Sequence, residues 1–220
     1  MKVKLLSYTQ PSPMRYELRD TQRIISYCAR VSNPNNQHNS ESSEKLLKYL
    51  IKNKHWSPFE MASMCVEIHT TRAISPQILR HRSFSFQEFS QRYAIPTDTF
   101  ATVLPELRRQ DTENRQNSID DLPSETAEYY EDRIDKHFRE GVELYESLLH
   151  SGVAKECARF VLPLATPTRI YMTGSCRSWI HYISLRTANG TQKEHMDLAN
   201  DCKKIFIEQY PTVAEALEWK

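Results

Sequence analysis

Residues 80–93 read RHRSFSFQEFSQRY, and this stretch is the most informative segment of the sequence. Its aromatic residues, Phe84 and Phe86 among them, alternate with polar residues, which is the period of a half-buried strand. Its arginines stand beside serines and aromatics, and a guanidinium presents a planar fork of donors that fits phosphate and carboxylate oxygens two at a time. The stretch therefore indicates either a site for an aromatic, phosphate-bearing small molecule or a strand with a cationic edge. Periodicity alone does not separate the two.

Outward from this stretch, the hydrophobic pattern predicts more helix than strand. Alternating apolar residues predict short strands at 3–8, 64–70 and 169–172. Apolar residues at helical spacing predict helices over 21–31, 41–54, 124–149, 153–161, 174–187 and 192–209, with a short helix beginning at 75 and another after Pro211. We therefore expect a mixed α/β (α+β) fold in one domain over residues 1–220, with helices packed on a small, mostly antiparallel sheet.

Two serine–proline pairs near this stretch predict helix starts. Ser57 and Glu60 have the spacing of a capping box, with proline at the first helical position, and Ser75 repeats the serine–proline pattern. A helix N-terminus offers free N–H groups and the positive end of the helix dipole to a phosphate, and His55 or Trp56 would supply a stacking face. The same residues also fit a plainly capped helix with an aromatic staple, so both interpretations stay open.

Composition narrows the classes of function. The chain has 220 residues and a net charge of +1, whereas a general nucleic-acid binder is usually more basic. Its five cysteines are an odd number without a C-x-x-C pair, which argues against a disulfide framework and a zinc knuckle. With four glycines there is no G-x-G-x-x-G loop, so arginines and helix ends would have to hold any dinucleotide. The absence of a signal-peptide or membrane-spanning run predicts a cytoplasmic protein with reduced thiols.

Further candidates lie outside this stretch. Arg177 and His181 are four residues apart and share one face of a predicted helix. Arg159 stands in the apolar run CARFVLPL, so we expect it to be partly buried and paired with a carboxylate or a ligand phosphate. Ser90 has no adjacent base, which favours a donor to phosphate over a nucleophile. The eight histidines show no metal-ligand spacing, so no metal is expected.

Four segments, in this order, resemble the flavin-dependent thymidylate synthases. The family signature is R-H-R, seven residues, then serine with an arginine two further on, and it stands here as Arg80-His81-Arg82 and Ser90-Gln91-Arg92. The segment His55-x-Ser57-Pro58-Phe59-Glu60 looks like the family's upstream element. Residues 158–164 resemble its A-R-x-x-L-P-L segment, and residues 177–186 resemble its R-S-x-x-[NH]-F-x-x-L-R helix.

The resemblance implies a methyltransferase that makes dTMP from dUMP. In this family 5,10-methylenetetrahydrofolate gives the methylene group, and FAD recharged by NADPH gives the hydride, in homotetramers with active sites at subunit interfaces. Carried over by position, Arg186 is the catalytic residue that polarises the uracil ring, and His55 and Tyr93 flank the flavin where folate stacks. The implied FAD ligands are Ser57, Arg80, His81, Arg82, Glu88, Arg177 and His181. The implied dUMP ligands are Gln77, Arg80, Glu88, Ser90, Gln91, Arg92, Arg159 and Arg186.

The chain departs from many relatives at two places. Ser175 stands where they carry asparagine, and Gly190 stands where they place a flavin-contacting histidine, for which Asn189 or Gln192 would substitute. The charged segment 97–122 is expected to be a long surface excursion, serving as a lid or an interface.

Two other functions fit parts of the same pattern. A module for single-stranded nucleic acid would use Arg80, Arg82 and the aromatics for stacking, although the near-zero net charge disfavours it. A non-catalytic oligomeric flavoprotein would bind the flavin and make no dTMP.

Overall fold

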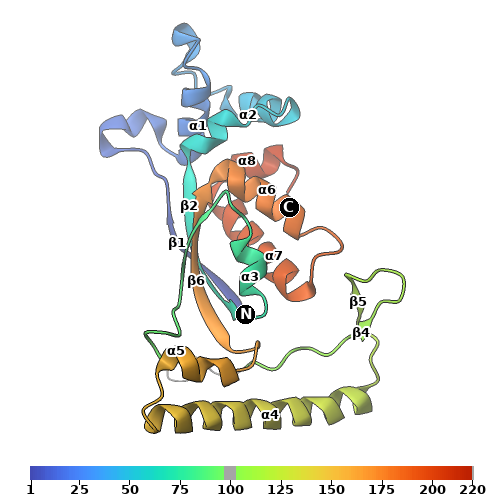
Figure 1. The fold of residues 1–220 in the computed structure, drawn as a ribbon. Helices are drawn as coiled ribbons and strands as arrows, with labels where there is room; N and C mark the ends of the chain where they lie inside the picture. The colour runs from blue at the N-terminus through green and yellow to red at the C-terminus, as the bar shows by residue number, and fades with distance from the viewer. Residues whose placement is uncertain (97–102, 220) are drawn as a thin grey trace.

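The fold comes from a computed structural model that describes residues 1–96 and 103–219 (Figure 1). Its strands are β1 Lys2–Tyr8, β2 Ser63–Thr71, β3 Ser85–Glu88, β4 Arg109–Gln110, β5 Ser118–Ile119 and β6 Pro167–Ser175. The main sheet has the order β1-β2-β6-β3, with every neighbouring pair antiparallel, while β4 and β5 form a separate small hairpin. The expected mixed fold with a small antiparallel sheet is confirmed.

Helices make up most of the rest of the described chain. They are α1 Thr21–Ala29, α2 Ser43–Lys52, α3 Ser75–Leu79, α4 Ser124–His150, α5 Lys155–Ala158, α6 Cys176–Arg186, α7 Lys193–Gln209 and α8 Pro211–Ala216, with 3-10 turns η1 Pro13–Leu18, η2 Pro34–Asn36, η3 Ser57–Met61 and η4 Arg159–Val161. Figure 1 shows α3, α6 and α7 beside the main sheet, and α4 with α5 as a separate layer at the bottom of the view.

The core lies between the central strands and the helices. Val66 and Ile68 of β2 stand opposite Met172 and Ile170 of β6, and all four side chains are fully buried. Burying an aliphatic side chain of this size contributes about 1.5–3 kcal/mol. Trp179 of α6 packs in the same cluster and donates its indole N–H to the Met64 carbonyl at 2.9 Å. This contact fixes α6 against β2, and with it the functional side chains that α6 carries.

Three local predictions are wrong. The capping box at Ser57 does not form, because Ser57–Met61 is a short 3-10 turn without a side-chain cap, and Glu60 pairs with Arg177 at 3.0 Å instead. Ser75 does not cap α3, since it lies inside the helix and donates its hydroxyl to Glu88 Oε1 at 2.6 Å. The helix predicted from residue 174 begins at Cys176, because strand pairing with β2 extends through Ser175. In each case a contact across the fold outweighs a local signal.

Helix α4 leaves much of its apolar stripe uncovered. Its 27 residues pack mainly against α5 and η4, and only Phe138 and Tyr145 of the helix are buried. Tyr130 and Leu144 are each 50% exposed. A long helix gains most of its stability from packing an apolar face, and on this part of α4 that packing is incomplete within the described chain.

The remaining predictions concern the charged segment 97–122, the state of the cysteines and membrane-spanning helices. Within segment 97–122, residues 97–102 lie outside the described residues, and the rest runs over the surface and carries the β4–β5 hairpin. All five cysteines are free thiols. Among the described residues, every helix is too short or too polar to cross a bilayer.

Candidate active site

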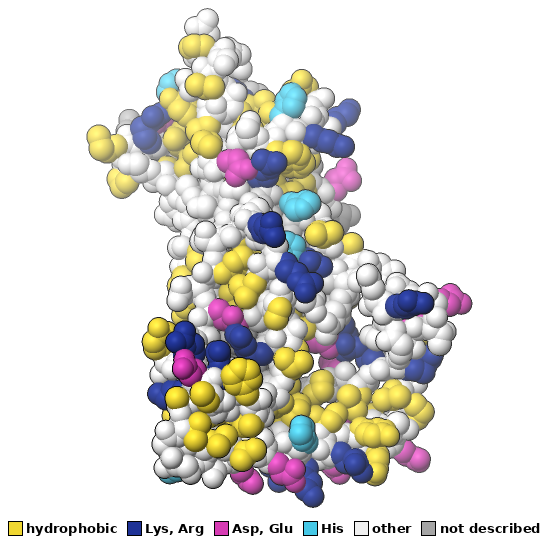
Figure 2. All heavy atoms as spheres, viewed as in Figure 1, with side chains coloured by type: hydrophobic (Ala, Val, Ile, Leu, Met, Phe, Trp, Pro, Cys, Tyr) yellow, Lys and Arg dark blue, Asp and Glu magenta, His cyan; other side chains and the backbone are white. Residues whose placement is uncertain are grey.

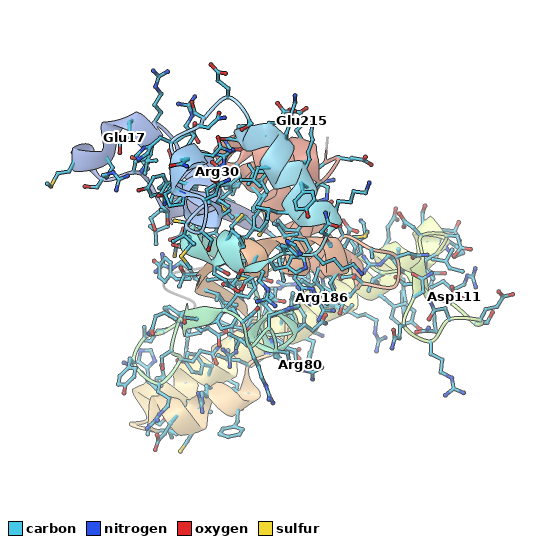
Figure 3. The ribbon with its side chains drawn as sticks, turned by 90° about the horizontal axis from the view of Figure 1, so that it is seen from above. Glu17, Arg30, Arg80, Asp111, Arg186 and Glu215 are labelled. Atoms are coloured by element: carbon cyan, nitrogen blue, oxygen red, sulfur yellow. The ribbon has the colours of Figure 1, made fainter. Side chains whose placement is uncertain are left out.

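Helix α6 contacts the turn that follows α3 near both of its ends. Arg186 Nε donates to His81 Nε2 at 2.9 Å, and Ser178 Oγ donates to the carbonyl of Ser83 at 3.1 Å. These two bonds tie the first half of the RHRSFSFQEFSQRY stretch to α6. Figure 3 shows Arg80 and Arg186 on the two neighbouring elements. The contact joins residues 105 positions apart, so the fold brings together two segments that the sequence separates widely.

His81 is neutral at physiological pH. Burial, followed by the charges of Arg186 and His181, lowers its pKa to about 4. Because Arg186 can only donate, the His81 Nε2 that faces it must be unprotonated, which places the ring proton on Nδ1. The ring also stands edge-on to Tyr182, with centroids 4.8 Å apart. A packed neutral imidazole therefore orients the Arg186 guanidinium without competing with it for an anion.

Exposed cations surround this contact. Arg80 and Arg82 are exposed and form no ion pair within residues 1–96 and 103–219, whereas Arg177 is bonded to Glu60 and His181 is exposed on the next turn of α6. Figure 2 shows basic side chains and histidines gathered in the middle of this face. Unpaired guanidinium groups beside one another suit an anionic ligand better than a structural role. The helix cluster, as we name it, comprises Gln77, Arg80, His81, Arg82, Arg177, His181 and Arg186.

A second group lies beside α5 and η4. Arg92 pairs with Glu156 at 3.1 Å, and Lys155 donates to the Tyr93 carbonyl at 3.2 Å. Arg159 is half-buried, and its guanidinium carbon lies over the Phe160 ring, 6.0 Å from the centroid. Of the two predicted partners of Arg159, a carboxylate or a ligand phosphate, no carboxylate is paired with it in the described part of the chain. The turn cluster, as we name it, comprises Ser90, Gln91, Arg92, Tyr93 and Arg159.

The two clusters are separate within one chain. Across the described ranges, no hydrogen bond or ion pair joins a residue of the helix cluster to one of the turn cluster. Tyr93 is 80% exposed, and His55 is exposed with its ring edge-on to Tyr49 at 6.0 Å. The structure therefore brings part of the predicted set together, with Ser57 on the turn η3 whose Glu60 bonds Arg177, and joins neither His55 nor the turn cluster to it by a hydrogen bond in the described ranges.

Glu88 is held more firmly than the sequence suggested. Its Oε1 receives Arg72 at 2.7 Å, Ser75 at 2.6 Å and Thr168 at 3.1 Å. The three donors come from the end of β2, from α3 and from β6. The Glu88 carboxylate thus links these three parts of the fold.

Gly190 has a backbone angle that suits glycine. Its φ of 89° lies in the left-handed region, where a histidine would be strained. Of the two suggested substitutes, Gln192 already bonds through its amide to Gln77 at 2.6 Å and Glu194 at 2.9 Å. Asn189 is exposed on the same turn, which makes it the freer side chain of the two.

Sequence reasoning missed a buried chain of polar residues beneath the helix cluster. Tyr182 bonds to His195 at 3.1 Å, and His195 bonds to Gln77 at 3.3 Å. His195 is fully buried, and burial lowers its pKa to about 4, with the charges of Arg186 and then His81 acting in the same direction. The Gln77 contact spans 118 positions, so local spacing carries little sign of it. In the described ranges, no group of His, Cys, Asp or Glu is arranged to hold a metal ion.

The structure defines a class of protein: a helix-rich α/β fold that carries a cluster of exposed arginines. Residues 5–212 match the family model described as thymidylate synthase complementing protein. The chain is 52% identical over 219 residues to the probable flavin-dependent thymidylate synthase of Paramecium bursaria Chlorella virus 1. It is 50% identical over 220 residues to the flavin-dependent thymidylate synthase of Synechocystis sp.. Both matches cover 100% of each chain.

A solved structure has the same fold. The UMP/dUMP methylase PolB from Streptomyces cacaoi, bound with 5-Br dUMP, superimposes with a TM-score of 0.82 at 25% identity, over 99% of this chain and 94% of that chain. The chain belongs to the family of flavin-dependent thymidylate synthases, as its four sequence segments predicted.

Proposed function

We propose that this chain methylates dUMP to dTMP, with 5,10-methylenetetrahydrofolate as the carbon donor and FAD, reduced by NADPH, as the source of the hydride. The observation that carries the proposal is the Arg186 guanidinium, oriented by a neutral His81 at 2.9 Å beside two exposed arginines that have no acidic partner among the described residues. The family membership of the chain supports the same reaction.

The helix cluster fits a flavin dinucleotide. Exposed Arg80 and Arg82 suit a pyrophosphate, because each guanidinium can donate two parallel hydrogen bonds to phosphate oxygens. His81, Arg177 and His181, with Ser57 and Glu88, would complete the FAD site, and Asn189 would take the place of the absent histidine. The flavin would supply the hydride-transfer chemistry, while the protein supplies binding, orientation and field.

The substrate contacts come from both clusters. Ser90, Gln91, Arg92 and Arg159 carry the hydroxyl, amide and guanidinium donors that a nucleotide phosphate needs, and Gln77, Arg80, Glu88 and Arg186 would hold the rest of dUMP. Arg186 has a second role. Hydride transfer to uracil C6 builds negative charge on the carbonyl and N3 side of the ring, and a fixed guanidinium stabilises that charge once water is excluded. Arginine stays protonated, so it acts through its charge and not as a base.

The separation of the clusters supports active sites shared between subunits. Phe160 and Leu164 beside Arg159 are 83% and 73% exposed, and α4 has an uncovered apolar stripe. A homotetramer that covers these surfaces would place the turn cluster of one chain against the helix cluster of another. His55 and the exposed Tyr93 ring would then form the side of the flavin on which folate and nicotinamide stack.

The direct test uses the purified full-length protein. We expect a yellow protein that releases flavin on denaturation and forms dTMP when given dUMP, methylenetetrahydrofolate and NADPH. Flavin binding without dTMP would favour a non-catalytic flavoprotein. A colourless protein that takes up no added FAD, but binds oligonucleotides with an affinity that falls steeply with salt, would favour the nucleic-acid module.

Arg82→Ala is expected to weaken FAD binding by about tenfold, because it removes a pair of charge-assisted hydrogen bonds to phosphate. Titration of apo protein with FAD measures the change. Arg23→Ala, which removes an α1 arginine paired with Asp20 at 3.6 Å, is the matched control and should bind FAD normally. An unchanged FAD dissociation constant in the Arg82 variant would remove this residue from the cofactor site.

A further inference from the structure

Polar residues beneath the helix cluster form one series of hydrogen bonds, which is buried at Tyr182 and His195 and reaches the surface at Gln192. It runs from Glu194 to Gln192 at 2.9 Å, to Gln77 at 2.6 Å, to His195 at 3.3 Å and to Tyr182 at 3.1 Å. It joins α7, α3 and α6, the elements around the Arg186–His81 contact. The Tyr182 ring at its far end also packs against His81.

The donors and acceptors in this series of hydrogen bonds follow one order, because the Glu194 carboxylate at one end can only accept a hydrogen bond. Glu194 is held by Arg108 at 2.5 Å; its burial favours the neutral acid, but the bonds from Arg108 and other donors outweigh burial and keep its pKa below the usual range. Gln192 must therefore turn its Nε2 toward the Glu194 carboxylate, which leaves its Oε1 to accept from Gln77. The Gln77 amide is thus orientated with Nε2 toward Gln192 and Oε1 toward His195.

The same order of donors and acceptors determines which ring nitrogen of the buried His195 carries the proton. Gln77 Oε1 accepts, so His195 must carry its proton on Nδ1, and its Nε2 then accepts from the Tyr182 hydroxyl. A reversed Gln77 amide would set its NH₂ group against the N–H of His195. One hydrogen on Gln77 Nε2 and one lone pair on Oε1 stay uncommitted in this arrangement, and they are available to a ligand.

We propose that His195 is a positioning residue for substrate binding: its Nδ1–H, bonded to Gln77 Oε1, holds the Gln77 amide in the direction that Gln192 sets, and with it the order of donor and acceptor that Gln77 presents to the uridylate. The inference rests on the proposed function, in which Gln77 contacts dUMP. A preset amide binds its ligand better than one free to rotate, because the ordering cost is met when the protein folds.

His195→Phe keeps an aromatic ring and removes both ring nitrogens. In the FAD-loaded enzyme we expect the dissociation constant for dUMP to rise about fivefold, with little change in kcat at saturating dUMP. His195→Asn still offers an N–H toward Gln77 and should recover most of the affinity. His38→Phe, in the outer loop against Tyr27, is the matched control and should bind dUMP normally.

A double-mutant cycle separates positioning from a general effect on packing. If His195 acts through Gln77, His195→Phe should add almost nothing to the loss of dUMP affinity in Gln77→Ala. Effects of the two substitutions that simply add would overturn the proposal. Failure of the wild-type enzyme to bind dUMP would instead count against the proposed function.

The tautomer of His195 gives a second test that needs no stable Phe variant. Nitrogen-15 NMR of histidine-labelled holoenzyme, with His195→Asn used for assignment, should show a neutral ring protonated on Nδ1 at pH 7. A ring protonated on Nε2, or on both nitrogens, would reverse or break the chain and would overturn the proposal.

Discussion

Replacing Arg186 with alanine is expected to lower kcat for dTMP formation by about 10²–10³-fold, the usual cost of removing one preorganised donor from a site of developing negative charge. The Nε of Arg186 is hydrogen-bonded to His81, which orients the guanidinium. Among the described residues no carboxylate pairs with this guanidinium, so its positive charge is not neutralised. Substrate affinity should fall less than kcat, because stabilisation that exists only in the transition state appears in kcat.

Steady-state and single-turnover rates of dTMP formation, with FAD content measured in parallel, test this role. The alanine variant should retain flavin, because the arginines proposed for the phosphates remain. Arg186→Lys keeps the positive charge but lacks the planar fork, so only part of the rate should return. Wild-type turnover in the alanine variant would contradict the assigned role. A loss of flavin together with the loss of rate would show that Arg186 holds the cofactor.

The fold and the family could be predicted largely from sequence because both leave local signs. The alternation in β2 and β6 and the helical spacing of α6 follow from which face of each element is buried, and this repeats along the chain. The four family segments are also contiguous stretches. Prediction therefore succeeded wherever neighbouring residues decide the outcome.

The local predictions that failed share one physical cause. Glu60, read as half of a capping box, is drawn to Arg177 from a distant helix, and the hydroxyl of Ser75 is taken by Glu88. A charge-assisted hydrogen bond is roughly twice as strong as a neutral one, so an available charge outweighs a cap. The role of His195 could not be predicted either, because its partners become neighbours only when α3, α6 and α7 pack together.

Mixing the inactive variants Arg159→Ala and Arg186→Ala is expected to restore thymidylate synthesis to about a quarter of the wild-type rate. The reason is that each site would take Arg159 from one subunit and Arg186 from another, so random assembly gives about one intact site in four. Within one chain Arg159 lies on η4 beside the exposed Phe160, without a bond to the helix cluster. Each variant alone should stay at least about 10²-fold below wild type.

Co-expression with two affinity tags, followed by isolation of doubly tagged oligomers, provides the mixed enzyme, and dTMP formation is the readout. The double variant Arg159→Ala/Arg186→Ala, mixed with wild-type chain, is the control. Sites shared between subunits would leave about a quarter of them intact in that mixture, whereas sites built from one chain would leave about half. Restored activity in the first mixture and a quarter in the second would place the two arginines on different subunits. If instead the two single variants fail to complement each other and the control retains half the activity, both guanidinium groups must reach dUMP from one chain, through a rearrangement of α5 and η4 toward α6.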